Sequence, residues 1–295
     1  MMLLLVCQGG KLKIGLIMHN KKISLAISTY KDSIFGIENV FSNIYDQCEL
    51  IVVVHQLDGE YDKLEYSTYK ASLEKAYSKI KILTDIGKGL SRSRNIALEF
   101  IKEREVDYIF LSDDDNVFIA DGVKKTIESN NINSIDVSIS KILTDTGRDF
   151  KNYNGRSVVT KRKLASVSSL EVCLSAPFVR QMKLKFDEDF GLGAKYPSCE
   201  EFIFLVDALK CGANIKYVNE YINVHGEESS GQNLNNIEIT IAKGAAFKRV
   251  YGSLAILVIF LFAVKKAFDK KHDDSFSFFK FISRLYTGFA DYSRE

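Results

Sequence analysis

Three consecutive aspartates, Asp113, Asp114 and Asp115, directly follow the apolar run of residues 108–111 and Ser112. Adjacent carboxylates repel one another, and a fold tolerates them chiefly where a cation compensates their charge. Asp113 and Asp115 can face one side, which gives the D-x-D arrangement that binds a divalent metal together with a diphosphate. An exposed acidic turn would explain an isolated cluster equally well. The position at the end of an apolar strand favours metal binding.

Two other groups of residues could act on a phosphate or a hydroxyl. Residues 87–95, GKGLSRSRN, place glycines before a helix and arginines in its first turns, and helix N-termini and arginines both favour anions. We expect Arg94 to serve the site and Arg92 to face solvent. Glu200 and Glu201 precede an apolar helical run, where a carboxylate could act as a catalytic base. The helix dipole alone would also explain a carboxylate there.

His225 is one of only four histidines in the chain and follows a short predicted strand. A single histidine is usually structural or exposed. Near a metal site, however, an imidazole is a suitable ligand. We therefore include His225 as a third candidate ligand beside Asp113 and Asp115.

These residues would meet if the first 120 residues alternate strand with helix. Apolar β-rich runs alternate with stretches of helical periodicity, which predicts a parallel sheet of βαβ units. The predicted strands are residues 23–28, 50–54, 80–83 and 108–111, and the predicted helices are 33–44, 66–78 and 90–102. Ligands of such sheets bind beyond the carboxyl ends of the strands. Thr29 and Tyr30, residues 55–58 and residues 113–115 should then line one crevice.

The second half of the chain has a less regular pattern. Residues 135–179 predict mixed or antiparallel strands, which would form an acceptor-facing half. Residues 201–210 predict a helix that ends at Gly212, and residues 215–218 predict a short strand after it.

The overall composition is that of a globular protein. With 46% hydrophobic and 26% charged residues in 295, a disordered, fibrous or disulfide-stapled chain is excluded. A net charge of +2 does not indicate nucleic-acid binding. The five cysteines lack CxxC spacing, which indicates free thiols in a reducing cytoplasm. Residues 1–17 lack the features of a signal peptide and are expected to be an extension or a short extra strand without a catalytic role.

The C-terminal part differs in charge from the rest. From residue 243 onward the net charge is +5, against −3 for the preceding residues. Residues 250–264 are uncharged and flanked by basic pairs, but a helix of this length spans about 22 Å, less than the roughly 30 Å hydrocarbon core. Residues 276–286 mix aromatic with basic residues, as in an interfacial helix. We expect peripheral or monotopic attachment to the cytoplasmic face of the cell membrane. Packing of both segments on the catalytic domain is the alternative.

Five segments in order resemble the family 2 glycosyltransferases of the GT-A fold. They span residues 23–218 and read ISLAISTYKD, LIVVVHQ, GKGLSRSRNIAL, YIFLSDDDNVF and FGLGAKYPSCEEFIFLVDALKCGANIKYV. The resemblance implies an α/β GT-A domain at residues 19–240, with a Rossmann-like nucleotide-sugar-binding sheet and a mixed acceptor half. The membrane-associated helices would then occupy residues 241–295. It also implies inverting transfer from a nucleotide-sugar, with a UDP-sugar expected, to a saccharide or lipid-linked acceptor in polysaccharide assembly. The expected cofactor is Mn²⁺ or Mg²⁺.

The resemblance assigns roles to individual residues as well. The nucleotide-sugar-binding residues would be Thr29, Tyr30, Gln56, Arg94, Asn95, Asp113 and Asp114. Asp115 would be the most direct metal ligand, and one member of the pair Glu200 and Glu201 would be the base that deprotonates the acceptor. Arg94 would either hold the phosphates or shape their pocket.

Two positions depart from the family pattern. His55 and Gln56 stand where the second strand usually ends in acidic residues, so recognition of the nucleobase would differ in detail. The pair Glu200 and Glu201 replaces Glu-Asp, which leaves the identity of the base open.

Two other functions also stay open at this point. A metal-dependent nucleotidyltransferase would need a basic glycine-rich loop after the first strand, and a non-catalytic membrane-bound scaffold would not need the carboxylates. The donor sugar, acceptor and linkage do not follow from the sequence.

Overall fold

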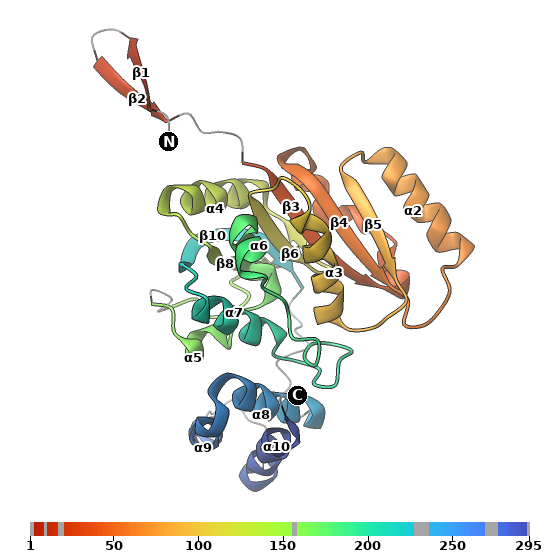
Figure 1. Cartoon of the computed structure of the whole chain (residues 1–295), viewed down its shortest axis with the longest axis vertical. Coiled ribbons are helices and arrows are strands. Elements are labelled where there is room, and N and C mark those ends of the chain that lie inside the picture. The colour runs from red at the N-terminus through yellow and green to blue at the C-terminus, as the bar shows by residue number, and fades with distance from the viewer. Residues whose placement is uncertain are drawn as a thin grey trace.

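The computed structural model describes residues 3–8, 11–16, 21–154, 158–226, 236–268 and 277–293. Its main sheet has eight strands: β3 (Ile23–Tyr30), β4 (Cys48–Gln56), β5 (Ile80–Asp85), β6 (Tyr108–Ser112), β7 (Val117–Phe118), β8 (Val137–Thr144), β9 (Val172–Ser175) and β10 (Ile215–His225). Their order in the sheet is β5-β4-β3-β6-β9-β8-β10-β7 (Figure 1). A separate hairpin, β1 (Leu3–Gln8) with β2 (Lys11–Leu16), lies in the predicted N-terminal extension.

The first half of the sheet is parallel, as the alternation of strands and helices predicts. β4 pairs in parallel with β3 and β5, and β3 pairs in parallel with β6. The second half is mixed, because β9 runs antiparallel to both β6 and β8 whereas β10 runs parallel to β8. The α/β fold with a mixed second half is therefore confirmed.

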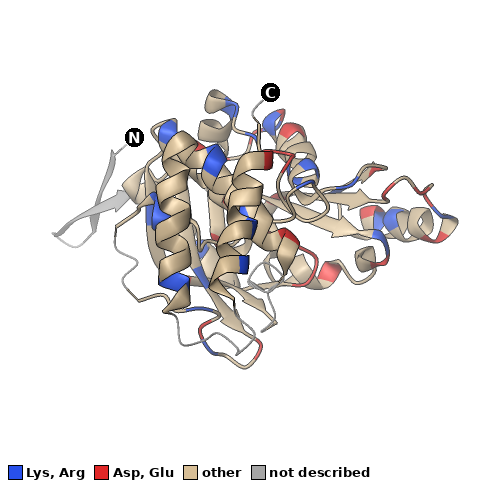
Figure 2. Cartoon of the chain, turned by 90° about the horizontal axis from the view of Figure 1, so that it is seen from below, with Lys and Arg blue, Asp and Glu red and all other residues tan. Residues whose placement is uncertain are grey.

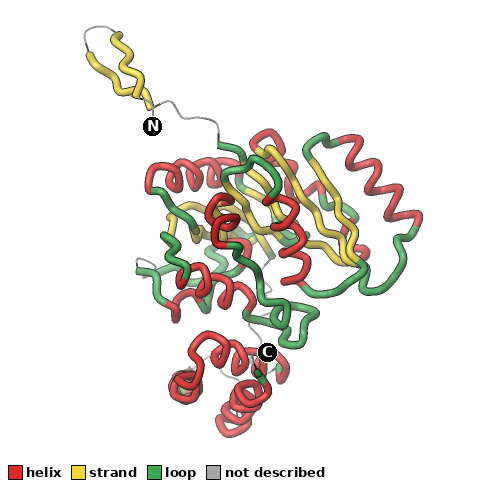
Figure 3. Tube along the Cα trace, in the orientation of Figure 1, coloured by secondary structure: helices red, strands yellow, loops and turns green. Residues whose placement is uncertain are grey.

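Helices cover both faces of the sheet (Figures 1 and 3). The α-helices are α1 (Glu38–Phe41), α2 (Leu64–Ala76), α3 (Leu90–Lys102), α4 (Ala120–Asn133), α5 (Lys161–Leu164), α6 (Ala176–Met182), α7 (Glu200–Lys210), α8 (Ile237–Tyr251), α9 (Ala255–Ala267) and α10 (Phe278–Asp291). Short 3₁₀ turns are η1 (Lys31–Ile34), η2 (Ser42–Gln47), η3 (Ser169–Glu171) and η5 (Gly252–Leu254).

The central strands bury both of their faces. In β3, Leu25 and Ile27 belong to the core that packs under α1, α2 and α4, whereas Ala26 belongs to the core under α3, α6 and α7. Because successive side chains of a strand point to opposite faces, a nearly pure apolar strand is what such a sheet requires.

Two elements differ from the predicted ones. Residues 33–44 form η1, α1 and η2 in place of one helix, since Gly36 adopts φ +87° and interrupts it. The strand expected at residues 215–218 continues to His225 as β10, which brings His225 to the same edge of the sheet as residues 113–115.

The C-terminal helices form a compact group against the α/β domain (Figure 1). α8 buries Ala242, Ala245 and Ala246 in the core that also contains α7, so the boundary predicted between residues 240 and 241 falls inside a helix. α10 crosses α8 at glycines from both helices, Gly244 and Gly288. Residues Ile237–Ala267, which include α8 and α9, make one helical stretch that is long and apolar enough to cross a membrane by length and composition.

Candidate active site

The carboxyl ends of three adjacent parallel strands place polar residues side by side. Tyr30 of β3 is the neighbour of Gln56 of β4, which is in turn the neighbour of Asp85 of β5. Gln56 donates a hydrogen bond of 2.9 Å from Nε2 to Asp85, and the Tyr30 hydroxyl donates one of 2.8 Å to Asp58. The side chain of Thr29 is buried at the same edge and acts on the carboxyl group of Asp114, whose pKa it lowers.

Asp85 is a member of this edge that the sequence analysis missed. It accepts two hydrogen bonds of 3.0 Å from Arg92 and one of 3.1 Å from the Gly87 amide. Burial raises the pKa of Asp85, but the bonds from Arg92, Gln56 and Gly87 outweigh this effect and keep the pKa below its usual value. β4 ends in Gln56 and has no carboxylate there. Asp85, at the end of the neighbouring strand β5, places a carboxylate beside it.

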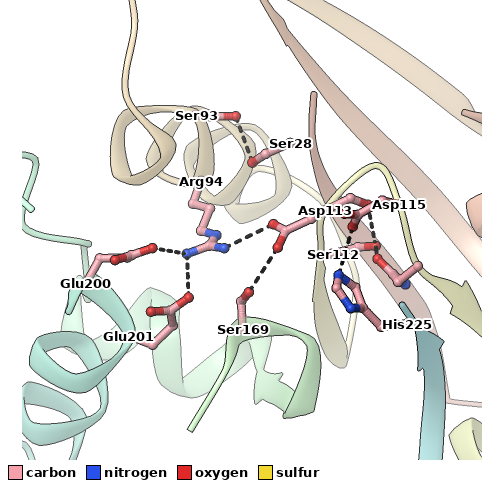
Figure 4. A network of polar contacts seen from close by, with 11 residues as sticks. Ser28, Ser93, Arg94, Ser112, Asp113, Asp115, Ser169, Glu200, Glu201 and His225 are labelled. Atoms are coloured by element: carbon pink, nitrogen blue, oxygen red, sulfur yellow. Dashed lines mark hydrogen bonds and ion pairs between the residues drawn. The ribbon is translucent and has the colours of Figure 1, made fainter. Parts of the chain in front are cut away.

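Arg94 holds together the two acidic motifs of the chain (Figure 4). It lies in the second turn of α3 with none of its side chain exposed. Its Nη2 donates to Asp113 at 3.1 Å, and its Nη1 donates to Glu200 at 3.3 Å and to Glu201 at 3.2 Å. Since its terminal nitrogens already have these partners, Arg94 is suited to shaping the pocket, one of the two expected roles.

The electrostatics of this cluster follow from burial and from its charge count. Burial lowers the pKa of the Arg94 guanidinium, but the charges of Asp113, Glu201 and Glu200 raise it by more. Burial raises the pKa of Asp113, with Arg94 acting against the rise. Burial, together with the charge of Glu201, raises the pKa of Glu200 to about 8. This shift favours the protonated form of Glu200.

Glu201 is the more accessible of the two glutamates. Its side chain is 18% exposed against 7% for Glu200, although both lie in the first turn of α7. The residue before them, Cys199, adopts a left-handed conformation with φ +78°, which is uncommon for a residue other than glycine. This turn directs the start of α7 toward Arg94.

Asp114 and Asp115 have different surroundings. Burial raises the pKa of Asp114 to about 6. Asp115 is 63% exposed, and its Oδ1 lies 3.3 Å from Nε2 of His225. Their hydrogen bond lowers the pKa of Asp115 and raises that of His225. The structure thus brings His225 into contact with Asp115.

The donors at Asp115 and His225 suit a divalent cation as a pair. The carboxylate oxygen and the imidazole nitrogen, which lie 3.3 Å apart, are both donor types that divalent metal ions accept. Within the described ranges, no group of three or more His, Cys, Asp or Glu side chains is arranged to hold a metal. The pair would need further ligands from a diphosphate or water.

Asn95 contacts the segment before α7, away from the acidic triplet. Its amide nitrogen donates to the Phe186 carbonyl at 3.0 Å and to Glu188 at 2.9 Å, and its oxygen accepts from the Phe186 amide at 2.8 Å. A direct role of Asn95 toward a nucleotide stays a prediction.

Two further neighbours of the cluster were not expected from the sequence. Ser169 of η3 donates to Asp113 at 3.4 Å, and the ring of Phe186 lies under the Arg94 guanidinium at 5.4 Å. Serine and phenylalanine carry no distinctive spacing, so only the folded chain reveals them. A separate open cavity of about 570 Å³, lined by residues such as Phe35 and Tyr69, involves none of the candidate residues.

The fold is similar to that of TarS from S. aureus. Its residues 1–349 match with a TM-score of 0.57 and 17% identity, over 84% of this chain and 72% of that one. The same fragment in complex with UDP-GlcNAc matches with a TM-score of 0.57 and 17% identity, over 81% and 70%. A longer TarS structure matches with a TM-score of 0.54 and 15% identity, over 84% and 44%. No protein-family model and no curated protein sequence matches the chain. The chain has the GT-A-like fold.

Proposed function

We propose that this chain is a glycosyltransferase that moves a sugar from a UDP-sugar to a hydroxyl group of a saccharide acceptor. The observation that carries the proposal is the link from Glu201 through Arg94 to Asp113, at the edge where parallel α/β sheets bind their ligands. The polar residues at the ends of β3, β4 and β5 support a nucleotide at the same edge. TarS, which shares the fold, has been crystallised with UDP-GlcNAc and with UDP.

In the proposed reaction Glu201 is the base. It accepts the proton of the acceptor hydroxyl while the hydroxyl oxygen attacks the anomeric carbon, and the bond between that carbon and the diphosphate breaks. The configuration at the anomeric carbon is inverted. Glu201 is preferred to Glu200 because a base must reach the acceptor, and Glu200 is nearly inaccessible. Arg94 fixes the orientation of Glu201.

A divalent cation, Mn²⁺ or Mg²⁺, would bind beside Asp115 and His225, with Asp113 as the next nearest candidate. When bound, it would neutralise the charge on the departing diphosphate. Asp113 already faces Arg94 and Ser169, whereas Asp115 is largely exposed. Asp114, Tyr30, Gln56 and Asn95 are proposed to contact or frame the nucleotide-sugar.

We further propose that the acceptor is lipid-linked and that the enzyme works at the cytoplasmic face of the cell membrane, in the assembly of a surface polysaccharide as its resemblance to family 2 enzymes suggests. α9 and the end of η5 support this proposal because they present a row of exposed apolar side chains: Leu254 of η5, and Ile256, Leu257, Phe260 and Leu261 of α9. A contiguous apolar surface of this kind commonly marks an interaction site.

The first experiment screens UDP-sugars and other nucleotide-sugars for binding and for slow hydrolysis, with and without Mn²⁺ or Mg²⁺. Metal-dependent binding of a UDP-sugar is the expected result. A complete absence of nucleotide binding under both conditions would overturn the enzymatic proposal and favour a scaffold. Transfer of a nucleotidyl group in place of a sugar would favour a nucleotidyltransferase.

The second experiment separates donor binding from transfer. Glu201→Gln should keep the Kd for the donor and lose about 10²–10⁴-fold in the rate of transfer, the usual contribution of a general base. Asp115→Ala and His225→Ala should weaken the metal dependence of donor binding. Glu99→Gln, an exposed carboxylate change on α3, is the matched control and should behave as wild type. Full transfer by Glu201→Gln would contradict the assignment of the base.

A further inference from the structure

The 183–199 segment connects α6 to α7 and ends at the proposed base. One of its sides is fastened to α3: Ser91 Oγ donates to the Phe190 carbonyl at 2.6 Å, and the Leu90 amide donates to the Leu192 carbonyl at 2.9 Å. In Figure 3 a long green loop runs from the α6 region toward the C-terminal helices. The segment therefore lies between the catalytic cluster and those helices.

The backbone of this segment touches the catalytic cluster directly. Gly191 has φ +108°, and a Cβ atom built there would lie 3.2 Å from Cδ of Glu200 and 3.1 Å from Oγ of Ser91. The chain thus passes close to the carboxyl group of Glu200, and any side chain at Gly191 would be strained by the positive φ and would have to displace its neighbours slightly. Any shift of the segment would change the space around Glu200 and hence the orientation of Arg94 and Glu201.

The other side of the segment is held by the end of α10. The Tyr196 hydroxyl donates a hydrogen bond of 2.6 Å to Asp291 Oδ2. Tyr292, which is buried, packs with ring centroids 5.7 Å from Phe190 and 6.1 Å from Tyr196. Phe190 and Tyr196 stack on each other at 4.9 Å. The last turn of α10 therefore closes an aromatic cluster around the two ends of the Gly191 turn.

α8 supplies a second, independent attachment. Arg249 donates to Asp187 at 2.8 Å and to Asp207 of α7 at 2.7 Å, and its side chain is almost wholly buried. An arginine that bridges two carboxylates in this way fixes their relative position. It links the start of the 183–199 segment to the body of the helix that carries Glu201.

We infer that the C-terminal helices position the proposed catalytic base, with Asp291 and Arg249 acting through the 183–199 segment as positioning residues. The inference rests on the proposed glycosyltransferase function. It gives α8 and α10 a role in transfer that is separate from any contact with a membrane. Neither residue touches the cluster of Arg94, so their effect must pass through the segment.

The experiment compares Tyr196→Phe and Asp291→Ala in the full-length chain, since both remove the hydrogen bond between these residues. Asp291→Ala also removes the 3.1 Å ion pair between Asp291 and Lys195. Each should lower kcat by about tenfold or more, as small misplacements of catalytic groups do, while the KM for the UDP-sugar changes little. The double variant should be no worse than the poorer single variant. Asp291→Asn keeps an oxygen acceptor for Tyr196 and should restore most of the activity. Thr287→Ala, whose hydroxyl bonds only within α10, is the control.

Amide exchange supplies a readout that does not depend on activity. Residues 190–199 should exchange faster in Tyr196→Phe and Asp291→Ala at an unchanged Tm. Equal kcat and equal exchange in these variants and in wild type would overturn the inference, whereas absence of transfer by the wild type with every donor would overturn the proposed function instead. If kcat and Tm fell together while amide exchange of residues 190–199 stayed as in wild type, the contact would contribute only to overall stability. That result would also contradict the inference.

Discussion

Arg94 faces the carboxyl groups of Asp113, Glu200 and Glu201 with a single positive charge. Three ionised carboxylates around one buried guanidinium would leave excess negative charge in a poorly solvated place. A proton on Glu200 relieves this excess, in agreement with its pKa of about 8. The raised pKa of the buried Glu200 thus favours its protonated form, whereas Glu201 is the more accessible of the two side chains.

This proton makes stability depend on pH. In the unfolded chain the pKa of a glutamate is near 4.3, as in model peptides, so between that value and about 8 the folded state binds the extra proton. The free energy of unfolding should therefore fall as the pH rises through this window. Glu200→Gln cannot ionise and should show a flatter profile, with a higher Tm than wild type at pH 9. Thermal unfolding of both proteins from pH 5 to pH 9 measures this, and parallel profiles would contradict it.

The acidic triplet, Arg94 and the two glutamates could be proposed from the sequence because each lies near an end of a predicted element, and the structure brings Arg94 into contact with Asp113, Glu200 and Glu201. The sequence could not show that Arg94 is sealed between carboxylates, since a basic first turn of a helix looks the same when it binds phosphate. A role for Asp85 could not be predicted from the sequence for a similar reason. Its role comes from the register of β4 and β5, which sets it beside Gln56, and no local pattern encodes that register.

At the level of elements, the helical periodicity of the sequence predicted α3 and α7 closely. α3 runs from Leu90 to Lys102 as predicted, and α7 ends at Lys210, as predicted from Gly212 beyond it. Residues 33–44 failed because their apolar spacing fits a helix while Gly36 and the tight turns around it do not. Lys248 and Arg249 form one of the basic pairs that flank residues 250–264, but Arg249 forms buried ion pairs with Asp187 and Asp207 and is not available to a lipid surface.

The crossing of α8 and α10 depends on glycine. A Cβ atom at Gly288 would lie 1.9 Å from the Ile241 carbonyl oxygen, and one at Gly244 would meet Leu285 equally closely. Gly288→Ala must push the two helices apart and should cost about 1–3 kcal/mol in the free energy of unfolding, as overpacked sites do. Urea unfolding measures this loss. Thr287→Ala, on the exposed side of α10, should leave stability within about 0.5 kcal/mol of wild type. Equal stability of the two variants would contradict such close packing.

On the scale of the whole molecule, the C-terminal helices contact the α/β domain on one side and are exposed on another. One side of α8 packs into the core of the α/β domain, while α9 is exposed along much of its length. Figure 2, seen from below relative to Figure 1, shows basic residues distributed along the helices that face the viewer. Because α8 is built into the core, α9 and α10 are the elements free to meet a membrane while the fold stays intact. That arrangement favours attachment to one leaflet over a full crossing by Ile237–Ala267.

Attachment of this kind can be measured with the full-length protein and vesicles. Leu257 and Leu261 are 59% and 57% exposed on α9, one turn apart. Insertion of each should contribute roughly 1.5–3 kcal/mol, so Leu257→Glu with Leu261→Glu should reduce co-sedimentation with phosphatidylglycerol vesicles by tenfold or more, by about the factor that such energies imply. Binding should also weaken with added salt, because Lys265 and Lys266 lie at the end of the same helix.

Ile132→Glu, at an exposed position on α4, should bind like wild type, and all variants should keep their affinity for UDP. If the α9 variant sedimented with vesicles as well as wild type does, the apolar row would have to serve a protein partner, and the acceptor would no longer need to be at a membrane.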